Sequence, residues 1–240
     1  PPSPIAGVRP ADRGVEDARL PPACPRPCSA PKGPPVLRPT RILLRDGESR
    51  ALLRAVDLGL VHRGYLGVAV DVAGTGGSEG QSMLFGRQEA RDGARLVEWA
   101  ADLPRSNGRV GLLGGSYLGI DQIFTAAEVG RDSPLKAIFP MVSASDPYRD
   151  LFVAGGIVNA ESGLGLIAAY FGLRTLTPLA ERPTDPADAL RLSLEHALAG
   201  IPFELTTGLD SVLHTGRVYD SPYWRERAPQ RVLTRVVRND

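Results

Sequence analysis

Residues 109–119 read Arg-Val-Gly-Leu-Leu-Gly-Gly-Ser-Tyr-Leu-Gly, and this stretch decides the fold. Its apolar first half is typical of a short buried strand, and the residues from Tyr117 to Glu128 are typical of a helix. A serine on the tight turn between a strand and a helix has its hydroxyl at the carboxyl edge of the sheet, as in a nucleophile elbow. Gly114 and Gly115 are small enough to allow such a turn.

Two candidate site residues follow from this turn. The Ser116 hydroxyl is the candidate nucleophile, and the backbone N–H of Tyr117 is the candidate donor to a developing oxyanion. The common pattern has glycine two residues after the serine, whereas Leu118 stands there and Gly119 comes one position later. Gly-Ser turns are also common as plain loops, so the motif alone leaves a purely structural turn open.

Helices and strands alternate around the elbow. Apolar residues at helical spacing predict helices within 49–63 and over 87–103, and apolar runs predict strands over 65–71 and 135–142. This alternation predicts an α/β fold with a mostly parallel sheet that helices cover on both faces.

The chain divides into four expected segments. Residues 1–35 hold eleven of the 22 prolines without a hydrophobic period, so we expect them to be disordered or loosely attached. Residues 36–150 form the expected core, and residues 151–230 a helical lid, because a helical insertion in an α/β sheet commonly covers the active site. Residues 231–240 begin the return to the core, with a strand predicted over 231–237.

The predicted lid contains recognisable helix signals. Asp185 and Pro186 are typical of an N-cap and a first helical residue, and Gly200 is typical of a helix end. Further short helices are predicted near 204–214 and 221–228.

Composition and charge limit the kinds of partner that we expect this chain to bind. The 240 residues carry a net charge of +1, which gives no electrostatic reason to expect nucleic acid or an anionic membrane. No apolar run approaches the ~20 residues that span a bilayer. The chain begins with proline rather than methionine, so we expect the natural amino end to be missing and assign no compartment.

The glycine-rich loop over 71–80 does not predict a cofactor. A dinucleotide fingerprint that starts at Gly74 needs glycine at position 79, where the chain has Glu79. A phosphate-binding P-loop needs Gly-Lys-Ser/Thr, whereas Gln81 follows Gly80. We therefore expect a tight loop near the serine, and no cofactor.

The cysteines do not predict a metal site. Cys24 and Cys28 are separated by Pro-Arg-Pro, and no histidine precedes His62, so a zinc site would lack ligands. A disulfide across this short, proline-containing span is sterically awkward. We expect free thiols.

A serine nucleophile needs a histidine base, and the chain has three histidines. His62 ends a predicted helix, and His214 is a polar residue at the end of a helix in the expected lid. His196 lies opposite the leucine face of its predicted helix, so we expect it to be exposed to solvent. We expect none of the three to reach the Ser116 hydroxyl.

Several motifs follow one another in a fixed order. They are Asp71–Gly80, Glu89-Ala-Arg-Asp92, Val97-Glu98-Trp99, Ser106-Asn-Gly-Arg-Val-Gly111, Gly114-Gly-Ser-Tyr-Leu-Gly119, Ser145–Asp150 and Ser221–Pro229. Together they resemble the cocaine-esterase and X-prolyl dipeptidyl-peptidase family of α/β-hydrolases, and the likeness covers about residues 36–240.

The resemblance implies an α/β-hydrolase core with a helical lid and a serine hydrolase that cleaves a small-molecule ester or amide, or a peptide, through an acyl-enzyme. Ser116 matches the nucleophile, the Tyr117 N–H matches one oxyanion donor, and the Tyr-x-Gly spacing matches the family pattern. The arginine of the family's glycine loop is Ala73 here. The family's second oxyanion donor, a tyrosine, has no match in the corresponding stretch Arg45–Glu48.

The family's acid and base follow the lid, and a carboxyl-terminal β-sandwich domain follows them. We therefore expect this chain to be the amino-terminal part of a longer hydrolase and to be inactive on its own. The alternative is a non-catalytic α/β-hydrolase-like module that kept the elbow.

Overall fold

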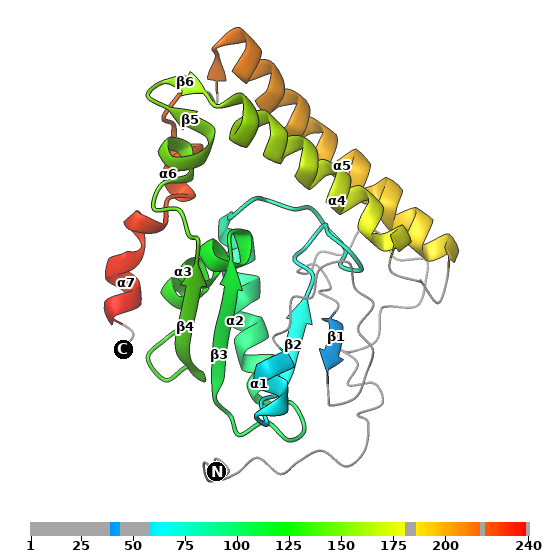
Figure 1. Ribbon diagram of the computed structural model, residues 1–240, viewed down its shortest axis with the longest axis vertical. Helices are drawn as coiled ribbons and strands as arrows, with labels where there is room; N and C mark the ends of the chain where they lie inside the picture. Colours follow the sequence, from blue (N-terminus) through cyan, green and yellow to red (C-terminus); the bar gives the residue numbers. More distant parts are fainter. Residues whose placement is uncertain (1–38, 44–57, 181–185, 217–218, 239–240) are drawn as a thin grey trace.

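The computed structural model describes residues 39–43, 58–180, 186–216 and 219–238. Figure 1 shows strands and helices below a helical hairpin. The elements in the first part of the chain, up to residue 141, are β1 (Pro39–Leu43), α1 (Leu58–His62), β2 (Gly67–Val70), α2 (Arg87–Ala101), β3 (Val110–Gly115), α3 (Tyr117–Glu128) and β4 (Leu135–Met141).

The strands confirm a mixed α/β arrangement with a short parallel sheet. β3 pairs in parallel with β4, with Leu112 opposite Ile138. β1 pairs with β2 in the antiparallel sense, with Ile42 opposite Val68. β2 runs beside β3 in the same direction, so the loop that follows β2 lies at the same end as the carboxyl ends of β3 and β4 (Figure 1).

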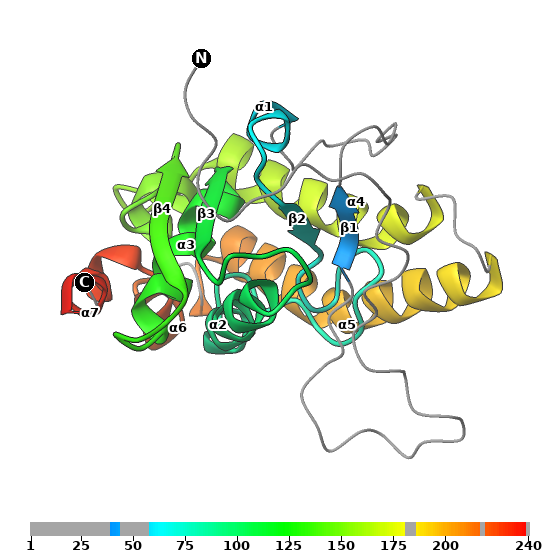
Figure 2. The same ribbon diagram turned by 90° about the horizontal axis from the view of Figure 1, so that it is seen from below.

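Helices cover one face of the β3–β4 pair. α2 and α3 pack against each other, and α3 packs on both strands (Figure 2). On the other face, Phe139 of β4 is 62% exposed and Leu113 of β3 is also exposed. Within the described ranges, the expected coverage of both faces is therefore found on one face only.

A long segment that leaves the core and returns to it follows β4; we call this segment, residues 145–231, the excursion. It begins with the short π-helix η1 (Tyr148–Phe152), the two-stranded hairpin of β5 (Val153–Ala154) and β6 (Ile157–Val158), and a second short π-helix, η2 (Ala160–Gly165). The helices α4 (Leu166–Ala180) and α5 (Pro186–Leu213) then pack side by side (Figure 1). The chain returns through α6 (Pro222–Glu226), the 3₁₀ turn η4 (Pro229–Arg231) and α7 (Leu233–Arg238).

The two ends of this excursion meet. The backbone N–H of Gln230 donates to the carbonyl of Ser145 (3.1 Å), and its side-chain amide donates to Asp146 (2.9 Å). The buried Trp224 ring lies 5.8 Å from that of Tyr148 and 5.0 Å from that of Phe152. The chain therefore leaves and re-enters the core at one place, as expected for an insertion.

The structure corrects two expectations about the helices. α5 begins at Pro186 as predicted but continues through Gly200 to Leu213, so Gly200 does not end it and the stretch near 204–214 is not a separate helix. A glycine in a helix interior costs only about 1 kcal/mol, which tertiary packing can outweigh. The described part of the predicted helix over 49–63 is α1.

The strand predicted over 231–237 is wrong. η4 and α7 occupy this stretch, and the N–H of Val236 donates to the carbonyl of Val232 (3.3 Å). Val232 is buried in the core cluster and Val236 packs against it. Their spacing of four residues puts both valines on one side of a helical turn, and a short apolar run does not distinguish this from a strand.

Some expectations concern residues outside the described ranges. These include the proline-rich segment 1–35 with Cys24 and Cys28, and the stretch Arg45–Glu48. Among the described helices, none is long and apolar enough to cross a membrane.

Candidate active site

Ser116 occupies the turn between β3 and α3, as the sequence predicts. Its backbone has φ 55° and ψ −123°, a conformation that favours glycine. The Ser116 N–H donates to the carbonyl of Met141 on β4 (2.9 Å), and the Ser116 carbonyl accepts from Gly119 (2.9 Å) and Ile120 (3.0 Å). A serine held in such a strained conformation by hydrogen bonds on both sides is typical of a functional site.

Two glycines let α3 approach the sheet. A Cβ on Gly119 would lie 2.7 Å from the Met141 carbonyl oxygen, and a Cβ on Gly114 would lie 2.5 Å from the Cβ of Leu118. Position 119 therefore requires a glycine, because the backbones of α3 and β4 come too close there to leave room for a side chain.

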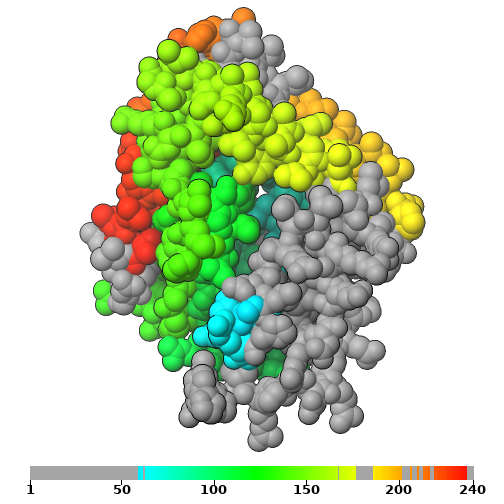
Figure 3. Space-filling view, in the orientation of Figure 1, coloured from blue at the N-terminus to red at the C-terminus, as the bar shows by residue number. Residues whose placement is uncertain are grey.

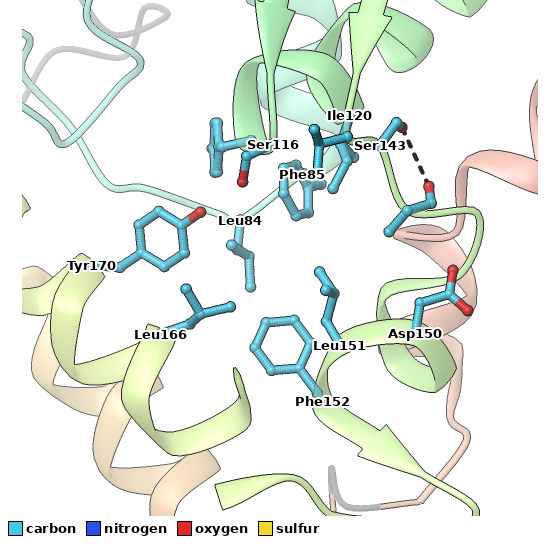
Figure 4. A pocket seen from close by; sticks show the side chains of 13 residues that line it. Leu84, Phe85, Ser116, Ile120, Ser143, Asp150, Leu151, Phe152, Leu166 and Tyr170 are labelled. Carbon is cyan, nitrogen blue, oxygen red and sulfur yellow. Dashed lines mark hydrogen bonds between the residues drawn. The ribbon is translucent and has the colours of Figure 1, made fainter. Parts of the chain in front are cut away.

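The Ser116 side chain faces a cavity of about 340 Å³ (Figure 4). Leu84, Phe85 and Ile120 line it from the core, and Leu151, Phe152, Leu166 and Tyr170 line it from the excursion. The Ser116 and Tyr170 hydroxyls both face this space (Figure 4). The surface is hollowed beneath α4, which overhangs the core (Figure 3). Apolar walls with a few polar groups are typical of a small-molecule site.

The Tyr117 side chain points into the core beneath this cavity. Its hydroxyl donates to Glu89 Oε2 (2.6 Å). Burial raises the pKa of Tyr117 well above its usual value, and the Glu89 charge adds to the effect, so the hydroxyl remains a donor. Burial also raises the pKa of Glu89, while its hydrogen bonds from Tyr117, Met83 and Phe85 oppose that shift. The sequence did not predict this pair, although Glu89 stands at the third position of α2, where a side chain can reach back to the preceding backbone.

Asp121, one turn further along α3, is a second buried acid that the sequence analysis missed. Burial raises its pKa to about 7, and the nearby carboxylates of Glu89 and Asp92 add to the shift. Its Oδ1 has no hydrogen-bond partner among the described residues. At neutral pH a large share of Asp121 is therefore uncharged.

Asp150 is the acid at the margin of the cavity. Its Oδ2 accepts from the backbone N–H groups of Ser145 (2.8 Å) and Asp146 (2.9 Å) and from the Ser145 hydroxyl (3.0 Å). The bond from Asp146 is the largest of the effects that lower the pKa of Asp150. The carboxylate therefore closes its own turn, and its oxygens point away from the cavity in Figure 4.

The expectation that His196 is exposed is wrong. His196 is 0% exposed, its Nε2 lies 2.8 Å from the Ser78 carbonyl oxygen, and its Nδ1 lies 3.3 Å from that of Arg174. The outward face of α5 instead carries exposed leucines, namely Leu190, Leu194 and Leu198. His214 is exposed, and the His62 side chain lies outside the described set. No described histidine is hydrogen-bonded to the Ser116 hydroxyl.

The glycine loop is closed by its own hydrogen bonds. Asp71 accepts from the Gly77 N–H (2.9 Å), the Ser78 hydroxyl donates to the Asp71 carbonyl (2.8 Å), and the Gly74 N–H donates to the Glu79 carbonyl (3.1 Å). Among the residues that the structure describes, no three His, Cys, Asp or Glu side chains come together in a way that could hold a metal ion.

Comparison with known proteins gives a family match along most of the chain. The family described as X-Pro dipeptidyl-peptidase (S15 family) matches residues 16–238. The cocaine esterase of Rhodococcus sp. is 34% identical over 138 residues, which are 57% of this chain and 23% of the esterase. A protein named as a serine esterase in Mycobacterium bovis is 40% identical over 101 residues, which are 40% of this chain and 15% of that protein.

A solved structure supports the fold. The aminopeptidase from a marine sediment archaeon, Thaumarchaeota archaeon, has a TM-score of 0.52 and 23% sequence identity, and the match covers 72% of this chain and 30% of that one. The chain therefore spans less than a third of each of these three relatives.

Proposed function

This chain belongs to the X-Pro dipeptidyl-peptidase (S15) family, and from that premise we propose that it carries the nucleophile of a serine hydrolase. The proposed reaction is cleavage of an ester or amide bond through an acyl-enzyme. The observation that carries the proposal is the strained backbone of Ser116 on the strand-to-helix turn, with its side chain at an apolar cavity.

Each site residue has a proposed role. The Ser116 hydroxyl attacks the carbonyl carbon, and the Tyr117 N–H, the first of α3, donates to the oxyanion that forms. The walls of the cavity are largely aliphatic and aromatic, so the group that occupies it would be apolar.

We assign the base and the acid to polypeptide beyond these 240 residues. A serine hydroxyl needs a base to become nucleophilic near neutral pH, and no described histidine is hydrogen-bonded to Ser116. The chain also spans only part of its relatives, so the activity of the whole protein is part of the proposal.

We also propose a division of the chain that fits this scheme. We propose residues 36–150 as an α/β-hydrolase core and 151–230 as a lid. Two observations favour a lid that covers Ser116. The two ends of the excursion meet at Ser145 and Gln230, and Tyr170 of α4 lines the cavity that Ser116 faces. Residues 231–240 begin the return to the core, through α7 rather than a strand.

Labelling with a fluorophosphonate probe tests the proposal. The 240-residue chain is compared with the same chain extended past Asp240 in its reading frame, each with a Ser116→Ala control, and the labelled peptide is identified by mass spectrometry. The expected result is fast labelling of Ser116 in the extended protein alone. If Ser116 is labelled in neither protein, the non-catalytic module is the better description.

A further inference from the structure

The turn 83–86, which enters α2, has an unusual backbone. Leu84 and Phe85 have φ values of 47° and 59°, so two successive residues with side chains are in the left-handed region. This conformation costs roughly 1–2 kcal/mol for each such residue. The turn therefore persists because its surroundings hold it.

A single buried carboxylate holds this turn. Glu89 is 3% exposed, and its two oxygens accept from the backbone N–H groups of Met83 (2.9 Å) and Phe85 (2.7 Å). The buried Arg227 holds the turn from another side, because its Nη2 donates to the Met83 carbonyl (2.8 Å).

The same carboxylate reaches the nucleophile helix. Glu89 Oε2, which accepts from Phe85, also accepts from the Tyr117 hydroxyl. The rings of Phe85 and Tyr117 lie 4.6 Å apart, centre to centre. Leu84 and Phe85 line the cavity that Ser116 faces (Figure 4), and Tyr117 follows Ser116 in the chain.

We infer that Glu89 is a positioning residue, whose carboxylate fixes the cavity wall at Leu84–Phe85 and the first residue of α3 relative to each other. The catalytic part of this inference rests on the proposed function. Glu89 would then set where an acyl group lies against the Tyr117 N–H, although it touches neither the substrate nor Ser116.

The chemistry of the contacts explains why a carboxylate stands at this position. Three donors point at the two oxygens of Glu89, and an ionised carboxylate only accepts hydrogen bonds. A glutamine would turn its NH₂ group toward one of these donors. A displacement of about 1 Å at a reacting group can cost on the order of 100-fold in rate.

Three variants separate the two contacts from the general effect of a buried charge. Glu89→Gln disturbs both the turn and the tyrosine bond, whereas Tyr117→Phe removes only the tyrosine bond. Asp92→Asn is the matched control, because Asp92 is another buried acid of α2, whose Oδ1 instead contacts Gln88 and Arg95.

Amide NMR on the 240-residue chain gives the first readout. We expect Glu89→Gln to speed hydrogen exchange at the Met83 and Phe85 amides by roughly 10- to 100-fold, the size of a lost charge-assisted hydrogen bond, and Tyr117→Phe to leave it unchanged. The Ser116 amide resonance, which reports the position of the turn into α3, should move in both variants and stay in place in Asp92→Asn. A residue that only added stability would move the melting temperature alone.

Fluorophosphonate labelling at Ser116, in the protein extended past Asp240, gives the second readout. Both variants should label more slowly than wild type, Asp92→Asn should match wild type, and the double variant should be no slower than Glu89→Gln alone. If Glu89→Gln does not fold, Tyr117→Phe still decides the outcome.

Two results overturn the inference: wild-type exchange at Phe85 in Glu89→Gln, or an unmoved Ser116 amide resonance in Tyr117→Phe. An extended wild-type protein that is not labelled counts instead against the proposed function, and the amide measurements on the 240-residue chain still decide the role of Glu89.

Discussion

The imidazole of His196 binds the glycine loop across 118 residues of sequence, with Nε2 at 2.8 Å from the carbonyl oxygen of Ser78. Its Nδ1 faces the carbonyl of Arg174 on α4, so one buried ring joins α4, α5 and the loop. The side-chain amide of Gln81 adds a second link, because it donates to the Ala199 carbonyl on α5 (3.0 Å). The helical hairpin is thus fastened to the core at the loop that follows β2.

We predict that His196→Ala destabilises the protein by roughly 2–4 kcal/mol. The substitution opens a cavity and removes the hydrogen bond from the imidazole to buried backbone. His214→Ala is the control, because the His214 side chain is exposed and both residues carry a Cβ at its φ of 51°, so the change should stay below about 1 kcal/mol. Urea unfolding of the two variants measures the difference, and equal midpoints would show that the His196 contacts carry little energy.

The burial of His196 shows what the sequence pattern could not reveal. The leucines at 190, 194 and 198 mark an apolar stripe, yet the buried side of α5 carries Ala189, Leu192, Ser193 and His196. Ser193, for example, donates to the carbonyl of Thr175 on α4. Hydrophobicity alone therefore predicts the wrong inward face, because backbone carbonyls of another helix decide the contact.

The elbow shows the opposite case. The strand, the turn at Ser116 and the helix were all predictable, because the glycines and the apolar run act within a dozen residues of one another. The roles of Glu89 and Asp121 were not predictable. Glu89 on α2 binds Tyr117 on α3, and the pKa of Asp121 on α3 depends on burial and on carboxylates of α2, and only the folded chain brings these two helices together.

We predict that Ser116→Gly stabilises the fold by about 1 kcal/mol. Glycine adopts the positive φ of this turn without the strain of a side chain, which outweighs its larger loss of chain entropy. Ser116→Ala retains a Cβ and should remain close to wild type. Denaturant midpoints of the three proteins check this, and a destabilised Ser116→Gly would show that the turn is not strained.

Two helical glycines should respond in opposite ways to alanine. Gly119→Ala places a Cβ 2.7 Å from the Met141 carbonyl oxygen, a backbone atom of the sheet, and should cost roughly 1–3 kcal/mol. Gly172→Ala on α4 meets nothing within 4 Å and should gain up to about 1 kcal/mol from helix propensity. Thermal melts of both variants measure the signs, and the steric reading fails if Gly119→Ala melts at or above wild type.

Asp121 should make stability depend on pH. Burial raises its pKa from 3.8 to about 7, so between these values the folded protein keeps a proton that the unfolded chain has lost. The contribution of Asp121 is therefore fully present below about pH 4 and declines as pH rises to about 7.

Asp121→Asn should remove this dependence. Relative to wild type, the variant should gain roughly 4 kcal/mol in the free energy of unfolding between pH 4 and pH 8. Urea unfolding at several pH values measures the gain. Parallel profiles for the two proteins would mean that Asp121 is ionised in the folded state throughout this range.

The 240-residue chain by itself should hydrolyse activated esters, such as p-nitrophenyl acetate, barely above background. Without a base, the Ser116 hydroxyl keeps its ordinary acidity and is a poor nucleophile near neutral pH. A site without a triad member retains about 10³–10⁴-fold catalysis over water, and the loss of one oxyanion donor removes about 10²–10³ of that. Ser116→Ala should therefore change the measured rate little.

Initial rates of the wild-type chain and Ser116→Ala, measured together with those of the exposed-site variant His214→Ala, provide the test. A rate that depends strongly on Ser116 would show that these residues already supply a base, and a rate that also falls in His214→Ala would identify it.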